Sequence, residues 1–202
     1  MASLGIQLPR YAMEHWRGER ELGIFAAITT LGMVARMMTL ALSRSALPRL
    51  SKQYARGSVE SFSRLTAKLV LLGLTVGCAG FLAAAAIGRP ILAMVYTPEY
   101  AEYNDVFMVT MLYAGLVAAF TFLGTAATAA QSFRPQVGIH ILKIMAIAGI
   151  CAWAVPRWGA LGAAWALFLG TLVSSLGYWV LLRRIVKRAP AEGAEESLLG
   201  GM

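Results

Sequence analysis

Three basic side chains lie inside long apolar stretches of this sequence: Arg36, His140 and Lys143. Residues 22–42 carry no formal charge other than Arg36. A charge at the centre of a bilayer costs about 2.5–3.5 kcal/mol on insertion scales, so a retained arginine there usually faces a water-filled cavity or a partner. Guanidinium and ammonium groups bind phosphate oxygens, and arginine does so through two parallel hydrogen bonds. These three residues are therefore the candidates for binding an anionic substrate.

Each candidate also has a plainer interpretation, which the sequence leaves open. Arg36 could snorkel to the membrane surface or make a structural hydrogen bond. Lys143 follows Val137 by about 9 Å along a helix, so it can snorkel more easily. His140 lies one turn before Lys143 and could line a cavity, but a single histidine in an apolar run is more often hydrogen-bonded to a neighbouring helix. We favour that structural interpretation for His140.

The sequence contains no pattern that would supply an enzymatic reaction. It has no GxxxxGK[ST] loop for nucleotide phosphates, and no arrangement of Ser, His and Asp can be placed on one face. Cys78 and Cys151 lie far apart in apolar stretches, without further Cys or His at metal-ligand spacing. We expect a protein that is not an enzyme and that uses neither a metal nor a cofactor.

The composition is that of a membrane protein. The chain is 58% apolar and 14% charged, whereas a soluble domain has about 25% charged residues. Its net charge of +8 could suggest nucleic acid, but the basic residues concentrate in short segments beside apolar runs. That pattern is typical of membrane orientation, so we expect no nucleic-acid partner.

We predict an all-α integral membrane protein with about five transmembrane helices. At 1.5 Å per residue, each apolar run is long enough to cross most or all of a hydrocarbon core of about 30 Å. The spans fall near residues 22–42, 69–87, 106–130, 137–155 and 160–182. Pro48 is expected to end the first helix, because proline removes a backbone hydrogen bond. The amphipathic residues 59–69 are either a separate turn of helix or an extension of the second span.

Three segments follow from these spans. Residues 1–21 form an outer interfacial segment, residues 22–188 the transmembrane domain, and residues 189–202 a disordered cytoplasmic tail. Eleven of the 18 Lys and Arg residues fall in the inner segments and five in the outer ones. This asymmetry predicts an outer N-terminus and a cytoplasmic C-terminus.

Small residues recur on two of the predicted spans. Gly73 and Gly77 form a GxxxG pair, and Gly170 and Ser174 have the same spacing. Such residues allow the backbones of two helices to approach closely. The sequence therefore predicts close helix packing at both faces, against helices that it does not identify.

Four phrases in the chain resemble one family. They are LPRYAMEHWRGERELGIFAAI, ALPRLSKQYARG, ILAMVYTPEYAEY and WGALGAAWA, in this order. Together they resemble the C-terminal half of Wzx-type flippases for lipid-linked oligosaccharides, in the multidrug/oligosaccharidyl-lipid/polysaccharide superfamily. The resemblance implies twelve to fourteen helices in two lobes around a central cavity, of which this chain has the last five of twelve.

By this resemblance, the chain is part of a transporter in the bacterial inner membrane. It would flip a pyrophosphate-bearing, lipid-linked oligosaccharide for the biosynthesis of a lipopolysaccharide or exopolysaccharide. Its partners would be membrane lipid, this substrate, and an N-terminal lobe or a second copy of the chain. A multidrug cation exporter and a non-transporting scaffold subunit are the alternatives. The predicted spans contain no Asp or Glu, which favours an anionic substrate over an organic cation.

Overall fold

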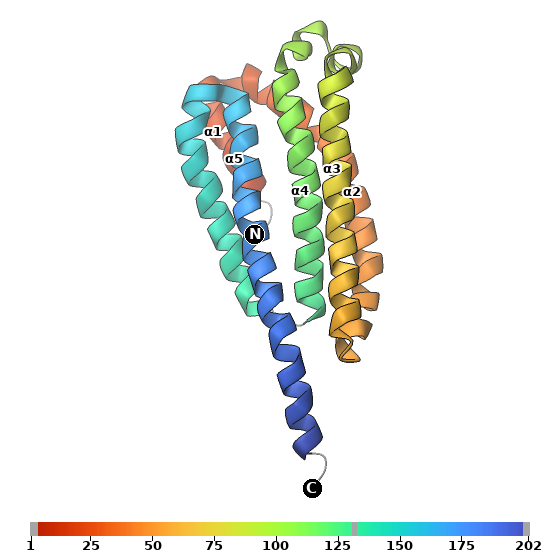
Figure 1. The fold of residues 1–202 in the computed structure, drawn as a ribbon. Coiled ribbons are helices and arrows are strands. Elements are labelled where there is room, and N and C mark those ends of the chain that lie inside the picture. Colours follow the sequence, from red (N-terminus) through yellow and green to blue (C-terminus); the bar gives the residue numbers. More distant parts are fainter. Residues whose placement is uncertain (1–3, 131–132, 200–202) are drawn as a thin grey trace.

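The chain folds into a bundle of long helices (Figure 1). The computed structural model describes residues 4–130 and 133–199. The elements are α1 (Leu4–Arg17), α2 (Glu19–Ala55), α3 (Val59–Val95), the short 3₁₀ helix η1 (Pro98–Tyr103), α4 (Asn104–Ala129) and α5 (Phe133–Leu199). No strand occurs in these two ranges, which confirms the all-α part of the predicted fold class.

Four of the described helices are long and apolar enough to cross a membrane. The first three predicted spans lie in α2, α3 and α4, apart from Ala130, which caps α4. The last two lie in α5, on either side of Gly159. Helices α2 and α3 have 37 residues each, or about 55 Å at 1.5 Å per residue. Both are longer than a hydrocarbon core of about 30 Å, so their ends would project beyond it.

Helix α5 reverses direction at Gly159, where φ is 52° and ψ is −129°. This backbone conformation is open to glycine and strained for residues with a Cβ. The first leg, residues 133–158, rises to this point, and the second leg, residues 160–199, descends beside it (Figure 1). The reversal and η1 lie at the same end of the bundle, which we call the upper end.

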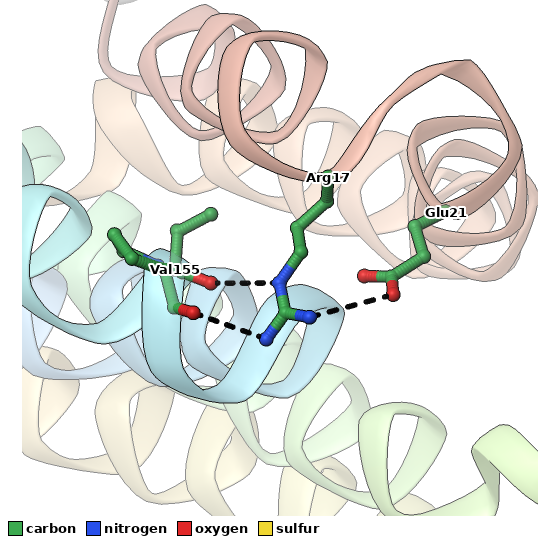
Figure 2. Close-up of polar contacts among 4 residues, drawn as sticks. Arg17, Glu21 and Val155 are labelled. Atoms are coloured by element: carbon green, nitrogen blue, oxygen red, sulfur yellow. Dashed lines mark hydrogen bonds and ion pairs between the residues drawn. The ribbon is translucent and has the colours of Figure 1, made fainter.

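Arg17 joins the end of α1 to the upper end of α5 (Figure 2). Its Nε donates to the carbonyl of Val155 at 3.3 Å, and its second guanidinium nitrogen donates to the carbonyl of Pro156 at 3.2 Å. The last carbonyls of a helix lack partners within the helix, and a basic side chain can satisfy them. Glu21 holds the same guanidinium in an ion pair at 4.0 Å. We call these contacts the Arg17 latch.

The sequence predicts that residues 1–21 lie at the membrane–water interface. In the structure, helix α1 packs along the first leg of α5. A Cβ at Gly5 would lie 3.6 Å from Ile147 of α5, and the other end of α1 is held by the Arg17 latch. Met13, midway between them, is completely buried. This helix is therefore part of the bundle, because its apolar face has a partner in α5.

Helix α2 continues through Pro48 to Ala55, so the predicted helix end at Pro48 is wrong. Proline removes its own N–H bond to the carbonyl four residues earlier, and its ring crowds that carbonyl, which can bend a helix without ending it. That residue, Arg44, is exposed, as is Pro48, so the freed carbonyl can be hydrated. Residues 59–69 belong to α3, which settles the open choice in favour of an extension of the second span.

The GxxxG pair on α3 packs against α4. A Cβ at Gly73 would lie 2.9 Å from the backbone nitrogen of Ala119, and a Cβ at Gly77 would lie 2.5 Å from the Cα of Gly115. Real side chains do not approach backbone atoms this closely, so only glycine permits the contact. The prediction of close packing at Gly73 and Gly77 is confirmed, and the partner helix is in the same chain.

The second small-residue face packs within α5. A Cβ at Gly170 would overlap the side chain of Ile147 on the first leg. Ser174 is fully buried and its hydroxyl donates to the carbonyl of Gly170. Both predicted faces are therefore satisfied by helices of this chain.

The lower end of α5 includes residues 189–199, which the sequence assigns to a cytoplasmic tail. The helix continues to Leu199, and residues 200–202 lie outside the described residues. Residues 189–199 are rich in alanine, glutamate and leucine, which have high helix propensity.

Candidate functional site

A cavity of about 400 Å³ lies between α2, α4 and the two legs of α5. We call it the cation cavity, for the residues described below. On α2, for example, the lining residues are Arg36, Leu40, Ser43, Arg44 and Leu47, a spacing that puts them on one face of the helix. α4 and the first leg of α5 contribute similar stripes. The walls of the cavity are thus single faces of three helices.

All three candidate residues from the sequence line this one cavity. Arg36 comes from α2, while His140 and Lys143 come from the first leg of α5. Arg44 joins them from α2, although it lies beyond the predicted span at residues 22–42. The spacing of eight residues between Arg36 and Arg44 was the available signal, since it places both on one helix face.

The basic residues of the cavity have no acidic partner among the described residues. Within the described part of the chain, the ion pairs join Arg17 to Glu21, Arg20 to Glu99 and Arg64 to Glu60, all away from the cavity. Arg36 and Arg44 are exposed, so the cavity is accessible beside α2. Unpaired guanidinium groups in an accessible cavity are available to bind an anion.

Aromatic rings form the wall beside Lys143. Its Nζ lies 4.4 Å from the ring centroid of Phe120, a cation–π contact. The His140 ring makes edge contacts with Phe120 at 5.7 Å and with Tyr178 at 6.4 Å between centroids. His140 is half-buried, and these ring contacts place it in the cavity wall. Tyr178 is not among the candidates that the sequence offered.

A chain of hydrogen bonds crosses the lower part of the cavity. The Tyr178 hydroxyl donates to the Gln136 side-chain oxygen at 3.3 Å, and the Gln136 amide donates to the Thr128 hydroxyl at 3.4 Å. This chain connects the second leg of α5, its first leg and α4. Gln136 lies one turn before His140, so the helical stripe that includes His140 was the signal that could have found it.

Hydroxyl groups line the α4 side of the cavity. Thr121 and Thr125 donate to backbone carbonyls one turn earlier, at 2.7 and 2.8 Å. Such hydroxyls keep lone pairs that can accept hydrogen bonds from a ligand or a neighbour. Ser43 of α2 makes a hydrogen bond with Thr125 and so ties α2 to α4 at the cavity wall.

A smaller hollow of about 60 Å³ continues from the cation cavity towards the upper end. Arg36 and Tyr113 line both spaces, and Arg10 of α1 lines only the smaller one. The inner face of the bundle therefore presents basic groups from three helices, at Arg10, Arg36, Arg44 and Lys143. This arrangement suits an elongated or multiply charged anion.

The chemistry of the cavity is that of binding. It combines cationic donors, hydroxyls, one amide and aromatic rings, and none of its described lining residues is a carboxylate. No group of three His, Cys, Asp or Glu side chains in the described residues is placed to hold a metal ion. The cavity can thus hold an anionic ligand that also carries hydrogen-bonding groups.

The chain is similar over most of its length to a curated bacterial protein. It is 25% identical, over 185 residues, to the capsular polysaccharide biosynthesis protein CapF of Staphylococcus aureus. The aligned region covers 92% of this chain and 47% of that protein, so the chain spans about half the length of its relative. Neither a family model nor a solved structure gives a significant match.

Proposed function

We propose that this chain is part of a transporter that flips a lipid-linked, pyrophosphate-bearing oligosaccharide across a bacterial inner membrane. The similarity to a capsular polysaccharide biosynthesis protein supports a role in polysaccharide biosynthesis. The long apolar helices support placement in a membrane. The observation that carries the proposal is the cation cavity, where Arg36, Arg44 and Lys143 face one space without a carboxylate.

The charge of the cavity favours an anionic substrate. Several like charges in one cavity repel each other, and each loses hydration in an apolar surrounding. A pyrophosphate would reduce both costs, with its oxygens bound by the arginine forks and by the lysine as a point charge. An organic cation would be repelled by these charges. The charge of the cavity thus disfavours a multidrug cation exporter.

The uncharged part of the lining fits a sugar. Hydroxyls of Thr125 and Thr128 and the amide of Gln136 can exchange hydrogen bonds with sugar hydroxyls. Phe120 and Tyr178 present aromatic surface beside them. A ligand with a pyrophosphate at one end and a sugar at the other would thus find matching groups along the cavity.

We propose that a second lobe completes the cavity. The chain spans about half of its relative, and Arg36 and Arg44 are exposed although they line the cavity. An N-terminal lobe or a second copy of this chain would cover this side. We also propose an outer N-terminus and a cytoplasmic C-terminus, on the basis of the uneven distribution of Lys and Arg.

The test is the export of surface polysaccharide by the full-length transporter carrying Arg36→Ala. We expect export to be abolished, while Arg36→Lys retains part of it, because lysine keeps the charge and loses the bidentate fork. Arg157→Ala is the control, since this exposed arginine lies at the upper end, outside the cavity. Normal export by Arg36→Ala at equal expression would remove Arg36 from the mechanism.

A further inference from the structure

We propose that a groove on the side of the bundle, separate from the cation cavity, binds an anionic phospholipid. The groove has a volume of about 600 Å³ and lies between α3, α4 and the second leg of α5. It shares no lining residue with the cation cavity. The inference rests on the proposed membrane placement of the bundle, and it does not depend on the transport of an oligosaccharide.

The groove changes from polar to apolar along α3. Its lining begins at Ser63 and continues through Val70 to Leu74, a rise of about 16 Å from Ser63. Leu123 of α4 closes the apolar part. In a membrane, an apolar cleft between helices is filled by lipid chains, because water cannot satisfy its walls.

Arg183 lies at the polar end of the groove. Gly73 of α3 packs beside Ala119 of the antiparallel α4, and Tyr178 of α5 lies 3.8 Å from the Cβ position of Gly124 on α4. When the helices are followed from these two contacts towards the lower end, α3 reaches Ser63 and α5 reaches Arg183 at about the same level of the bundle. The groove therefore has a guanidinium and a hydroxyl at one end and aliphatic walls at the other.

The guanidinium of Arg183 is available to a phosphate. Its Cζ lies 3.4 Å from the ring centroid of Trp179, so the ring occupies one face of the guanidinium. Stacking leaves the N–H groups pointing outward in the guanidinium plane, where they can donate to phosphate oxygens. In the described part of the chain Arg183 has no acidic partner, and Glu60 is paired with Arg64 at 2.7 Å.

These features specify an anionic phospholipid as the occupant. Its phosphate would lie against Arg183 and Ser63, and an acyl chain would extend past Val70 and Leu74. A zwitterionic lipid also has a phosphate, but its ammonium group would lie near the guanidinium and weaken the attraction. Basic pockets between membrane helices at the cytoplasmic side are suited to anionic headgroups, and the lower end is the side where Lys and Arg concentrate.

The experiment is native mass spectrometry of the purified 202-residue chain in detergent. The chain is titrated with phosphatidylglycerol or phosphatidylcholine carrying the same acyl chains. We expect phosphatidylglycerol to bind about fivefold more tightly, the effect of one basic residue near an anionic headgroup. Arg183→Ala should remove this preference, and Arg183→Lys should keep part of it.

Two further variants separate the groove from general surface charge. Arg157→Ala is the matched control, because Arg157 also lies over a tryptophan, 4.6 Å from the Trp153 centroid, but donates to the Trp153 carbonyl. It should keep the preference. Ala67→Trp places a large side chain in the groove lining and should weaken the binding of both lipids.

Equal binding of the two lipids by the unaltered chain would overturn the inference, as would an unchanged preference in Arg183→Ala. The failure of the proposed function is a separate result. If export survives Arg36→Ala, the transport proposal fails, while a phosphatidylglycerol preference that depends on Arg183 still supports the lipid site.

Discussion

The upper end of the bundle and the cation cavity contain the same basic residue types in opposite surroundings. At the upper end, Arg17 donates to two carbonyls and pairs with a glutamate, and Arg20 pairs with a glutamate at 3.0 Å. In the cavity, Arg36, Arg44 and Lys143 line a space that contains no carboxylate. The first group of charges is neutralised within the fold and the second is not.

This difference separates structural from ligand-binding charges. The hydrogen bond and the charge of Glu99 raise the pKa of Arg20. Glu99 therefore stabilises the charged form of this guanidinium. A cavity cation has no such partner, and its retention inside an apolar helix needs another explanation. The comparison predicts that Arg17 stabilises the fold, while the cavity arginines serve a ligand.

The largest effect on stability is expected at the Arg17 latch, from Gly159→Ala. A side chain at φ 52° is strained by about 1–3 kcal/mol, and its Cβ would overlap Glu21, which pairs with Arg17. The free energy of unfolding, measured in mixed micelles, should fall by at least this amount. Gly149→Ala is the control, since nothing lies within 4 Å of its Cβ position. Equal stability of the two variants would show that the reversal tolerates a side chain.

A smaller loss is expected from Arg17→Ala. This change removes two hydrogen bonds to helix-end carbonyls, with a net effect of about 1–2 kcal/mol on the free energy of unfolding. Arg20→Ala removes an exposed ion pair and should change stability little, because exposed pairs are screened by solvent. The same unfolding assay compares the two variants. A larger loss of stability in Arg20→Ala than in Arg17→Ala would contradict the stabilising role of the Arg17 latch.

The smallest effect on stability is expected from Arg36→Ala. Removing an unpaired cation from an apolar helix leaves no partner unsatisfied, so the free energy of unfolding should not decrease. This result would support the distinction between structural and ligand-binding charges, because the same variant is expected to abolish export. If Arg36→Ala destabilises the chain as much as Arg17→Ala, then Arg36 is a structural residue and the comparison fails.

The helices could be predicted from the sequence because long apolar runs favour one outcome. The five predicted spans coincide with helical segments, and the packing of Gly73 and Gly77 was predicted from spacing alone. The ends of the helices were harder to predict. Pro48 was expected to end α2, but α2 continues, since at this exposed position the freed carbonyl can be hydrated.

The candidate site could be predicted in part. Arg36, His140 and Lys143 attracted attention because a charge or an imidazole is unusual in an apolar run. Gln136 and Tyr178 did not, because their residue types have many ordinary uses near the end of a span. The structure brings them together at the cavity, where they make a hydrogen bond between two legs of one helix.

The sequence by itself determined the apolar helices, the surplus of basic residues and the absence of carboxylates from the spans. The helical period also fixed which residues share a face, as for Arg36 and Arg44 on α2. Only the tertiary structure decided which faces meet. The rotation and register of each helix depend on packing contacts such as Gly77 against Gly115, and a shift of one residue turns a helix by about 100°. Those contacts bring Arg36 and Lys143, from helices far apart in the chain, to one cavity.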